Sequence, residues 1–138
     1  MATHLVDKSV IARMGKGAVA AVVEPLIMNG SLATCAAIDL EVLFSVRSGA
    51  EHRAKRADLE LRFGQVPIER QVLDRAIDVQ GLLADRGQHR GANVIDLIVA
   101  ATAERAGLTV LHYDSDFDLI ASVTNQATQW VVPRGSVD

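Results

Sequence analysis

The chain has 138 residues, of which 49 % are apolar and 22 % are charged, and its formal net charge is −3. This is the length of one compact domain, so we expect residues 1–138 to form a single domain. The composition argues against a disordered chain. The acidic balance argues against a protein that is held on nucleic acid by bulk positive charge.

Cysteine usage and the lengths of the apolar runs bear on where the protein works. Cys35 is the single cysteine, so no internal disulfide can form. No apolar run reaches the roughly 20 residues that a membrane helix needs, and no basic-then-apolar leader opens the sequence. We therefore expect a cytoplasmic protein that does not enter a membrane.

Short apolar segments alternate with longer helical segments along the chain. The first half predicts strands at His4–Asp7, Leu32–Cys35 and Val66–Ile68, and helices at Val10–Met28 (interrupted near Gly15–Gly17), Ala36–Val46 and Ala50–Arg62. The second half predicts helices at Glu69–Asp85, Val94–Ala106 and Phe117–Ser122, strands at Leu108–His112 and Thr128–Val132, and a short tail at Pro133–Asp138. Gly107 stands where a left-handed helix cap belongs. This alternation predicts an α/β fold, with a parallel sheet inside a three-layer α/β/α sandwich.

Four of the seventeen acidic residues stand where topology predicts a shared position. Asp7 and Asp114 end predicted strands, whereas Glu41 and Asp96 lie early in predicted helices that are otherwise apolar. In right-handed βαβ units, a strand ends and the next helix begins at the same edge of the sheet. Ligands bind at that edge in open α/β sheets. We therefore expect these four carboxylates to lie close together.

Carboxylates that are gathered at one edge repel each other. Two of them about 5 Å apart repel by roughly 3 kcal/mol at an effective dielectric of 20, so some must be protonated or neutralised by cations. Each acid alone is more commonly a turn former or a helix cap, but the shared edge favours a metal site. Oxygen ligands without a nearby His–Cys set favour Mg²⁺ or Mn²⁺ over zinc. Such an ion activates water and screens charge on phosphate, which is the chemistry of phosphodiester hydrolysis.

Four segments, in this order, resemble the motifs of a PIN domain, and specifically those of VapC-type toxins from bacterial toxin–antitoxin pairs. Leu5–Ser9 resembles the opening Asp-x-Ser/Thr strand end, and Ile38–Phe44 resembles the segment that holds a glutamate. Asp96–Ala103 is similar to the helix in which Asp precedes Ile-Ala-Ala-Thr-Ala, and Leu111–Phe117 resembles the closing Asp-x-Asp-Phe segment. The resemblance covers nearly the whole chain. It implies a PIN-like fold and a Mg²⁺- or Mn²⁺-dependent endoribonuclease.

The resemblance also implies roles for individual residues and partners for the chain. The catalytic metal ligands would be Asp7, Glu41, Asp96 and Asp114. Asp116 would be a further metal ligand, and Ser9 would support the position of the attacking water. The implied partners are an RNA substrate and a VapB-type antitoxin that silences the toxin, in a homodimer or a toxin–antitoxin hetero-oligomer.

Basic and aromatic residues supply further candidates for RNA contacts. Arg86, His89 and Arg90 lie in a basic loop before the Asp96 helix, where they would overhang the acidic edge. His112 has two interpretations, because it could contact a phosphate or simply end a strand. Aromatic residues make up only 4 % of the chain, which argues against a stacking platform for bases.

Two other kinds of protein would share the size and the acidic edge. A receiver-like signalling domain would need a lysine near its last strands, but Lys8, Lys16 and Lys55 all lie in the first half of the chain. A non-catalytic interaction domain would leave the acids without a chemical role. Substitution of the acids would then change stability alone.

Overall fold

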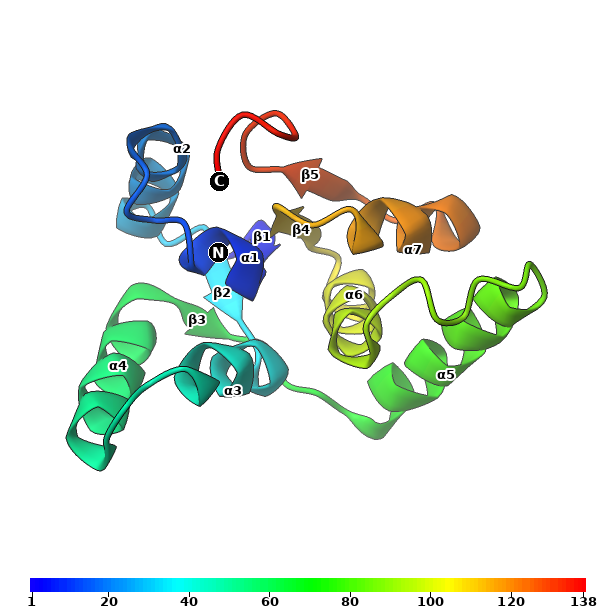
Figure 1. Ribbon diagram of the computed structural model, residues 1–138. Coiled ribbons are helices and arrows are strands. Elements are labelled where there is room, and N and C mark those ends of the chain that lie inside the picture. The colour runs from blue at the N-terminus through cyan, green and yellow to red at the C-terminus, as the bar shows by residue number, and fades with distance from the viewer.

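The computed structural model describes residues 1–138 as five strands and seven helices (Figure 1). The strands are β1 His4–Val6, β2 Leu32–Thr34, β3 Gly64–Gln65, β4 Thr109–His112 and β5 Thr128–Trp130. The helices are α1 Lys8–Ile11, α2 Gly17–Met28, α3 Ala36–Phe44, α4 Gly49–Arg62, α5 Arg70–Ala84, α6 Val94–Ala106 and α7 Asp116–Thr124. None of the helices is both long enough and apolar enough to span a bilayer.

All five strands are parallel, and their order in the sheet is β3-β2-β1-β4-β5. In the central strand, Leu5 pairs with Ala33 of β2 on one side and with Val110 of β4 on the other. Leu5, Val110 and Leu111 have no exposed surface. Full burial of such a side chain contributes about 1.5–3 kcal/mol. The three inner strands β2, β1 and β4 are therefore largely buried, as in a parallel sheet that is covered on both faces, whereas the edge strands β3 and β5 are more exposed.

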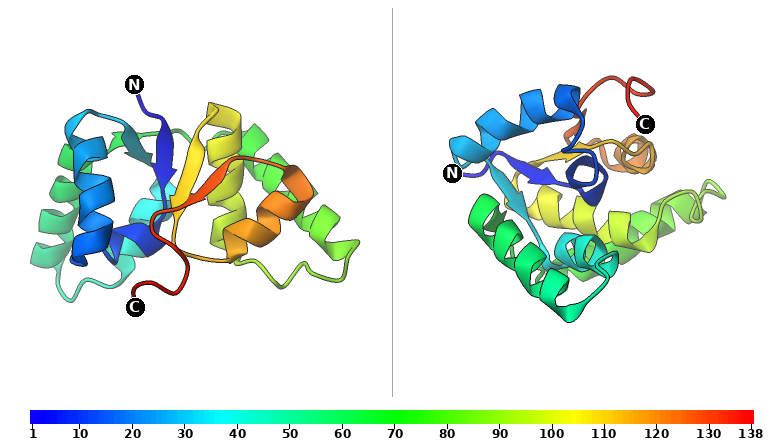
Figure 2. Two further views of the ribbon diagram at one scale, coloured as in Figure 1. Left: turned by 90° about the horizontal axis from the view of Figure 1, so that it is seen from above. Right: turned by 60° about the vertical axis from the view of Figure 1, so that its left-hand side comes forward.

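Helices cover both faces of the sheet and confirm the three-layer α/β/α sandwich. Helix α2 lies on one face, and α6 and α7 lie on the other (Figures 1 and 2). Helix α5 packs against α6 and α7, and α3 packs against α1, α4 and α6. Because every strand is parallel, the carboxyl ends of β1, β2 and β4 meet at one edge of the sheet.

Helix α6 connects this edge to the opposite one. The side chain of Asn93 caps its start, with Oδ1 accepting a hydrogen bond from the Ile95 amide at 2.8 Å. The small side chains of Ala100 and Ala103 are buried and allow the helix to lie close to the sheet. At the other end, Gly107 adopts φ 70°, which confirms the predicted left-handed cap.

Two predicted segments differ from the structure. The strand predicted at Val66–Ile68 is instead the short edge strand Gly64–Gln65, which pairs with β2. The Val66 amide still donates to Thr34 O at 2.9 Å, but Pro67 has no amide proton and ends the pairing. Residues 133–138 are not a free tail, because they fold back against the end of β4 through the Tyr113 side chain.

Candidate active site

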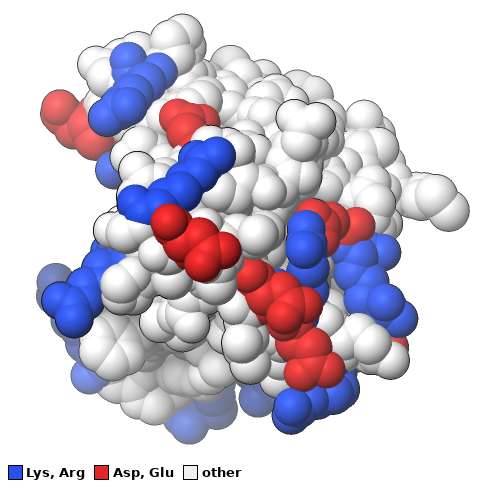
Figure 3. All heavy atoms as spheres, turned by 90° about the vertical axis from the view of Figure 1, so that its right-hand side faces the viewer, with Lys and Arg blue, Asp and Glu red and all other residues white.

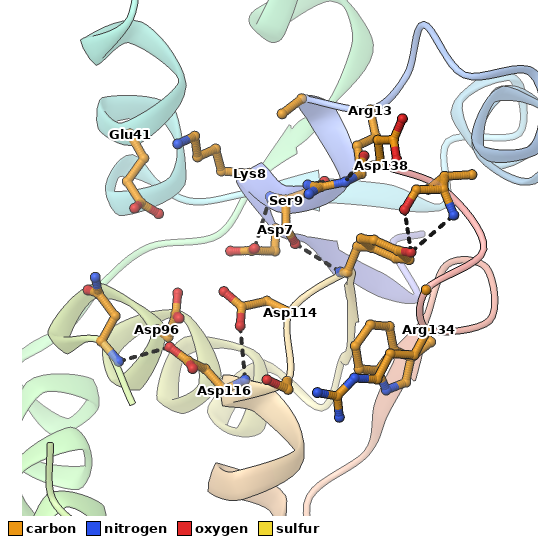
Figure 4. A pocket seen from close by; sticks show the side chains of 17 residues that line it. Asp7, Lys8, Ser9, Arg13, Glu41, Asp96, Asp114, Asp116, Arg134 and Asp138 are labelled. Carbon is orange, nitrogen blue, oxygen red and sulfur yellow. Dashed lines mark hydrogen bonds between the residues drawn. The ribbon is translucent and has the colours of Figure 1, made fainter. Parts of the chain in front are cut away.

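A cavity of about 670 Å³ opens at the carboxyl edge of the sheet (Figure 4). The structure brings all the predicted acids and the predicted serine to its wall, namely Asp7, Ser9, Glu41, Asp96, Asp114 and Asp116. They come from the β1–α1 junction, α3, the first turn of α6 and the β4–α7 junction. Their carboxylates converge on one hollow, as expected from the topology (Figure 4).

Asp7 is the acid that β1 delivers to the cavity. Its Oδ2 accepts a hydrogen bond from the Ser9 amide at 3.0 Å and so caps α1, which therefore begins at Lys8 rather than at the predicted Val10. Its Oδ1 is buried and has no hydrogen-bond partner. Burial raises the pKa of Asp7, the bonds from Ser9 oppose that rise, and the charge of Asp114 adds to it.

Ser9 links the ends of two neighbouring strands. Its Oγ accepts a hydrogen bond from the Tyr113 amide at 2.9 Å, and its backbone amide donates to Asp7 Oδ2 at 3.0 Å. The β1 end and the β4 end are thereby held at a fixed separation. Asp7 and Asp114, which follow these two strands, are positioned together.

Asp96 lies in the first turn of α6 and is only 5 % exposed. Burial, a hydrogen bond with Asp116 and the charges of Asp7, Asp114 and Asp116 together raise the pKa of Asp96 to about 9. Asp116 is itself fixed by the Asn93 amide, which donates to its Oδ2 at 3.0 Å. The start of α6 and the start of α7 are thus joined through this pair of acids.

The turn after β4 positions Asp114. Its Oδ1 accepts a hydrogen bond from the Asp116 amide at 2.9 Å. Its own amide donates to Nδ1 of His112 at 3.2 Å. His112 is fully buried between Phe117 and Trp130, with both ring centroids at 5.0 Å, so it does not reach a phosphate. Burial lowers its pKa, and the neutral ring holds the turn that carries Asp114.

Glu41 reaches the cavity from α3. Burial raises its pKa, and the charges of Asp7 and Asp114 add to that effect, whereas Lys8 opposes it. The Lys8 ammonium extends beside the Glu41 carboxylate (Figure 4). Glu41 is less buried than Asp7 and Asp96, and it forms the more solvent-exposed wall of the cluster.

The acids form two sets of possible metal ligands that share Asp96. One set is Asp7, Glu41 and Asp96, and the other is Asp96, Asp114 and Asp116. In each set, one potential ligand atom per residue lies within 4.8 Å of the others. The unpartnered, buried Oδ1 of Asp7 is costly unless something satisfies it. A divalent cation fits this set of hard oxygen donors.

The cations that line the cavity are Lys8, Arg13 and Arg134. None of the predicted RNA contacts Arg86, His89 and Arg90 lines it. Arg86 instead donates to Ser122 of α7, with Nη1 3.2 Å from Oγ. On the face that carries α7 and the α5–α6 turn, acidic and basic side chains are interspersed rather than gathered in one basic patch (Figure 3).

The three lining cations were not among the predicted site residues, although two of them lie close to the Asp7–Ser9 motif in the sequence. Lys8 stands between Asp7 and Ser9, so its proximity to the motif was a usable signal. Arg13 also lies near the motif, four residues after Ser9, and it donates to Ser9 O at 2.8 Å. Arg134 gives no such signal, since it reaches the site only because residues 133–138 fold back.

Comparisons with known proteins show the family to which the chain belongs. A family model of the PIN domain matches residues 4–123. The chain belongs to the PIN-domain family. It is 44 % identical to ribonuclease VapC51 of Mycobacterium tuberculosis over 135 residues, which cover 98 % of this chain and 97 % of the relative. It is 41 % identical to ribonuclease VapC21 of the same species over 133 residues, or 96 % of each chain. Within the PIN-domain family it is thus a member of the VapC group, and the receiver-like alternative is wrong.

Solved structures of VapBC complexes share the fold at low sequence identity. The DNA-bound VapBC complex of Salmonella typhimurium contains a chain that aligns with a TM-score of 0.77 and 14 % identity, over 96 % of this chain and 100 % of that one. A chain of VapBC2 from Rickettsia felis, bound to a DNA fragment from its promoter, aligns with a TM-score of 0.76 and 12 % identity, over 93 % and 98 %. These likenesses concern the fold.

Proposed function

We propose that this PIN-domain chain is the toxin of a type II toxin–antitoxin pair, an endoribonuclease that uses Mg²⁺, or Mn²⁺ in its place, to hydrolyse RNA phosphodiester bonds. The observation that carries the proposal is the convergence of five carboxylates, from four separate parts of the chain, on one cavity. The identity to proteins named ribonucleases supports the RNA substrate.

Asp7, Glu41, Asp96 and Asp114 would hold the cation, with Asp116 as a fifth ligand. When bound, such an ion lowers the pKa of a coordinated water and stabilises negative charge on phosphate. Asp96 binds a proton strongly without a cation, so binding of the cation displaces this proton. Ser9, fixed between Asp7 and the Tyr113 amide, would orient the attacking water toward the phosphate.

The cations around the acids would counter the repulsion between this acidic cavity and RNA. Lys8 lies beside Glu41 at one side of the cavity, and Arg134 lies across it (Figure 4). Arg86, His89 and Arg90 would contact parts of the RNA outside the cavity. Substrate selection would then rest on the shape of the RNA more than on an extended basic surface.

A cytoplasmic antitoxin of the VapB type is the proposed partner. The structural neighbours described as VapBC complexes support this partner. Exposed apolar side chains on α3 also support a protein partner or a homodimer, because Leu40 is 69 % exposed and Phe44 is 90 % exposed beside the acidic site.

The decisive experiment incubates purified protein and its Asp96→Asn variant with total RNA in Mg²⁺, Mn²⁺ or chelator, and maps the cut ends. We expect cleavage in either metal, none in chelator, and a loss of about 10²-fold or more in the variant, as for removal of other charge-stabilising groups. Asp74→Asn is the matched control, since Asp74 is an exposed partner of Arg70. Cleavage by Asp96→Asn at the rate of the parent would reject the proposal and favour the non-catalytic alternative.

A further inference from the structure

The segment 133–138 forms one wall of the acidic cavity. Tyr113 Oη donates to Val137 O at 2.8 Å and accepts from the Val137 amide at 3.2 Å. Arg13 Nε donates to Asp138 O at 2.9 Å. Arg134 and Val137 line the cavity together with the acids. Residues 133–138 are therefore fixed next to the end of β4, close to Asp114, which follows that strand.

Within this segment, Arg134 lies on the face of Trp130. Its guanidinium carbon is 5.8 Å from the centroid of the tryptophan ring. The ring is itself held in place, because Nε1 lies 3.2 Å from both carboxylate oxygens of Asp118. Tyr113 meets Trp130 edge to face at 5.4 Å. Arg134 therefore rests on a fixed aromatic support.

Arg13 and Arg134 differ in whether their guanidinium groups already donate hydrogen bonds within the protein. Arg13 stacks over Tyr113 at 4.8 Å and donates to Ser9 O and Asp138 O, so it holds the wall together. Arg134 takes part in none of the six ion pairs of the molecule and in none of its side-chain hydrogen bonds. The guanidinium of Arg134 is thus positioned but free to bind a ligand.

We propose that Arg134, supported by Trp130 and held by the folded-back segment, binds a backbone phosphate of the RNA next to the one that is cleaved. This inference rests on the proposed function. A cation among the acids can neutralise the scissile phosphate, but the neighbouring phosphates of the strand still meet an acidic cavity. Arg134 lies across this cavity from Glu41, and a guanidinium binds two phosphate oxygens at once (Figure 4).

The test measures binding of a short labelled RNA that spans a mapped cleavage site, in the Asp96→Asn background with Mg²⁺ and over a series of KCl concentrations. Adding Arg134→Gln should weaken binding about tenfold, the loss expected for one charge-assisted hydrogen-bonded contact. The slope of log affinity against log salt should become shallower by about 0.7, because one phosphate contact with a single strand is lost. Arg134→Lys should restore the slope but only part of the affinity.

The control variant is Arg105→Gln, which removes the same charge at the far end of α6, where the side chain is 49 % exposed. We expect this variant to keep the affinity and the salt slope of its background. If Arg134→Gln behaves like Arg105→Gln, the inference is wrong even though the proposed function stands. Wild-type protein that cleaves no RNA in Mg²⁺ or Mn²⁺ would instead reject the proposed function itself.

Tyr113→Phe tests whether the folded-back segment positions Arg134. This change removes the hydroxyl that holds Val137 and keeps the ring under Arg13. It should weaken RNA binding severalfold in the Asp96→Asn background, and the combination with Arg134→Gln should bind no more weakly than Arg134→Gln alone. Additive losses would show that Tyr113 acts on RNA by another route and would overturn the positioning role of the segment.

Discussion

Among single residues, Asp96 is the acid whose surroundings most strongly disfavour its ionised form. It is buried at the start of a helix, and the carboxyl groups of Asp7, Asp114 and Asp116 all disfavour its charged form. A helix start favours a negative charge, but burial and three nearby acids outweigh this effect. The result is a pKa of about 9, so this residue is protonated near neutral pH whenever no cation compensates the cluster.

This raised pKa predicts how stability depends on pH in chelator. Between the ordinary pKa of 3.8 and about 9, the folded state holds a proton that the unfolded state releases. The free energy of unfolding should therefore fall as pH rises through this window. Burial raises the pKa values of Asp7 and Glu41 in the same direction. Denaturant unfolding at several pH values, with EDTA present, measures the slope.

The variants Asp96→Asn and Asp74→Asn separate this effect from general charge. Asp96→Asn should flatten the pH dependence and raise the melting temperature at high pH, because it removes the group that must otherwise ionise. Asp74→Asn, on the exposed side of α5, should keep the slope of the parent. Equal slopes in all three proteins would contradict the assignment of the raised pKa to Asp96.

At the scale of elements, α6 and β4 carry Asp96 and Asp114 to the same edge, and Gly107 connects them. The Gly107 amide donates to the end of α6, and the Leu108 amide donates to Ala103 O at 2.9 Å. With φ at 70°, Gly107 occupies a region that side chains disfavour, although no atom lies within 4 Å of the position of an added Cβ. A substitution of Gly107 would therefore lower the free energy of unfolding through the strained backbone conformation and not through a steric clash.

Two glycine substitutions should consequently act in opposite directions. Gly107→Ala should lower the free energy of unfolding by about 1–2 kcal/mol, the cost of the left-handed conformation. Gly81→Ala, at an exposed helical position near the end of α5 with open space around it, should raise the free energy by about 0.5–1 kcal/mol. Urea unfolding of both variants provides the measurement. If Gly107→Ala raised the free energy of unfolding, the left-handed cap would not be what fixes the connection between α6 and β4.

The elements also show what the sequence could predict and why. The parallel sheet and the meeting of Asp7, Glu41, Asp96 and Asp114 follow from local patterns, because βαβ topology places strand ends and helix starts at one edge. The edge strand was misplaced because Val66 and Ile68 are apolar, whereas pairing with β2 selects Gly64 and Gln65. The cavity wall at 133–138 depends on a hydroxyl 24 residues away from Val137, and no local pattern encodes such a contact.

At the scale of the whole molecule, a net charge of −3 is distributed unevenly. Many surface acids lie beside basic partners, as Asp58 does between Lys55 and Arg62, and these exposed pairs contribute little stability. The acids in the cavity form none of the ion pairs of the molecule, although the charge of Lys8 lowers the pKa of Glu41. The cavity is thus where we expect a divalent cation to stabilise the fold.

Binding of Mg²⁺ should therefore stabilise the entire domain. A cation that binds only the folded state adds about 2.7 kcal/mol at a concentration one hundred times its Kd, which corresponds to about 10 °C in melting temperature for a chain of this size. A thermal melt followed by circular dichroism over a MgCl₂ titration measures the shift. The shift should be larger at pH 8 than at pH 6, because the cation displaces the proton of Asp96.

Two comparisons distinguish binding at the cavity from general screening of charge. KCl at matched ionic strength screens all acids alike and should produce a much smaller shift than MgCl₂. Asp96→Asn removes the ligand that both sets of acids share, so its shift in MgCl₂ should fall toward the KCl value. If the variant gained as much stability from Mg²⁺ as the parent does, the cation would bind elsewhere, and the stability of the fold would be independent of the site proposed for catalysis.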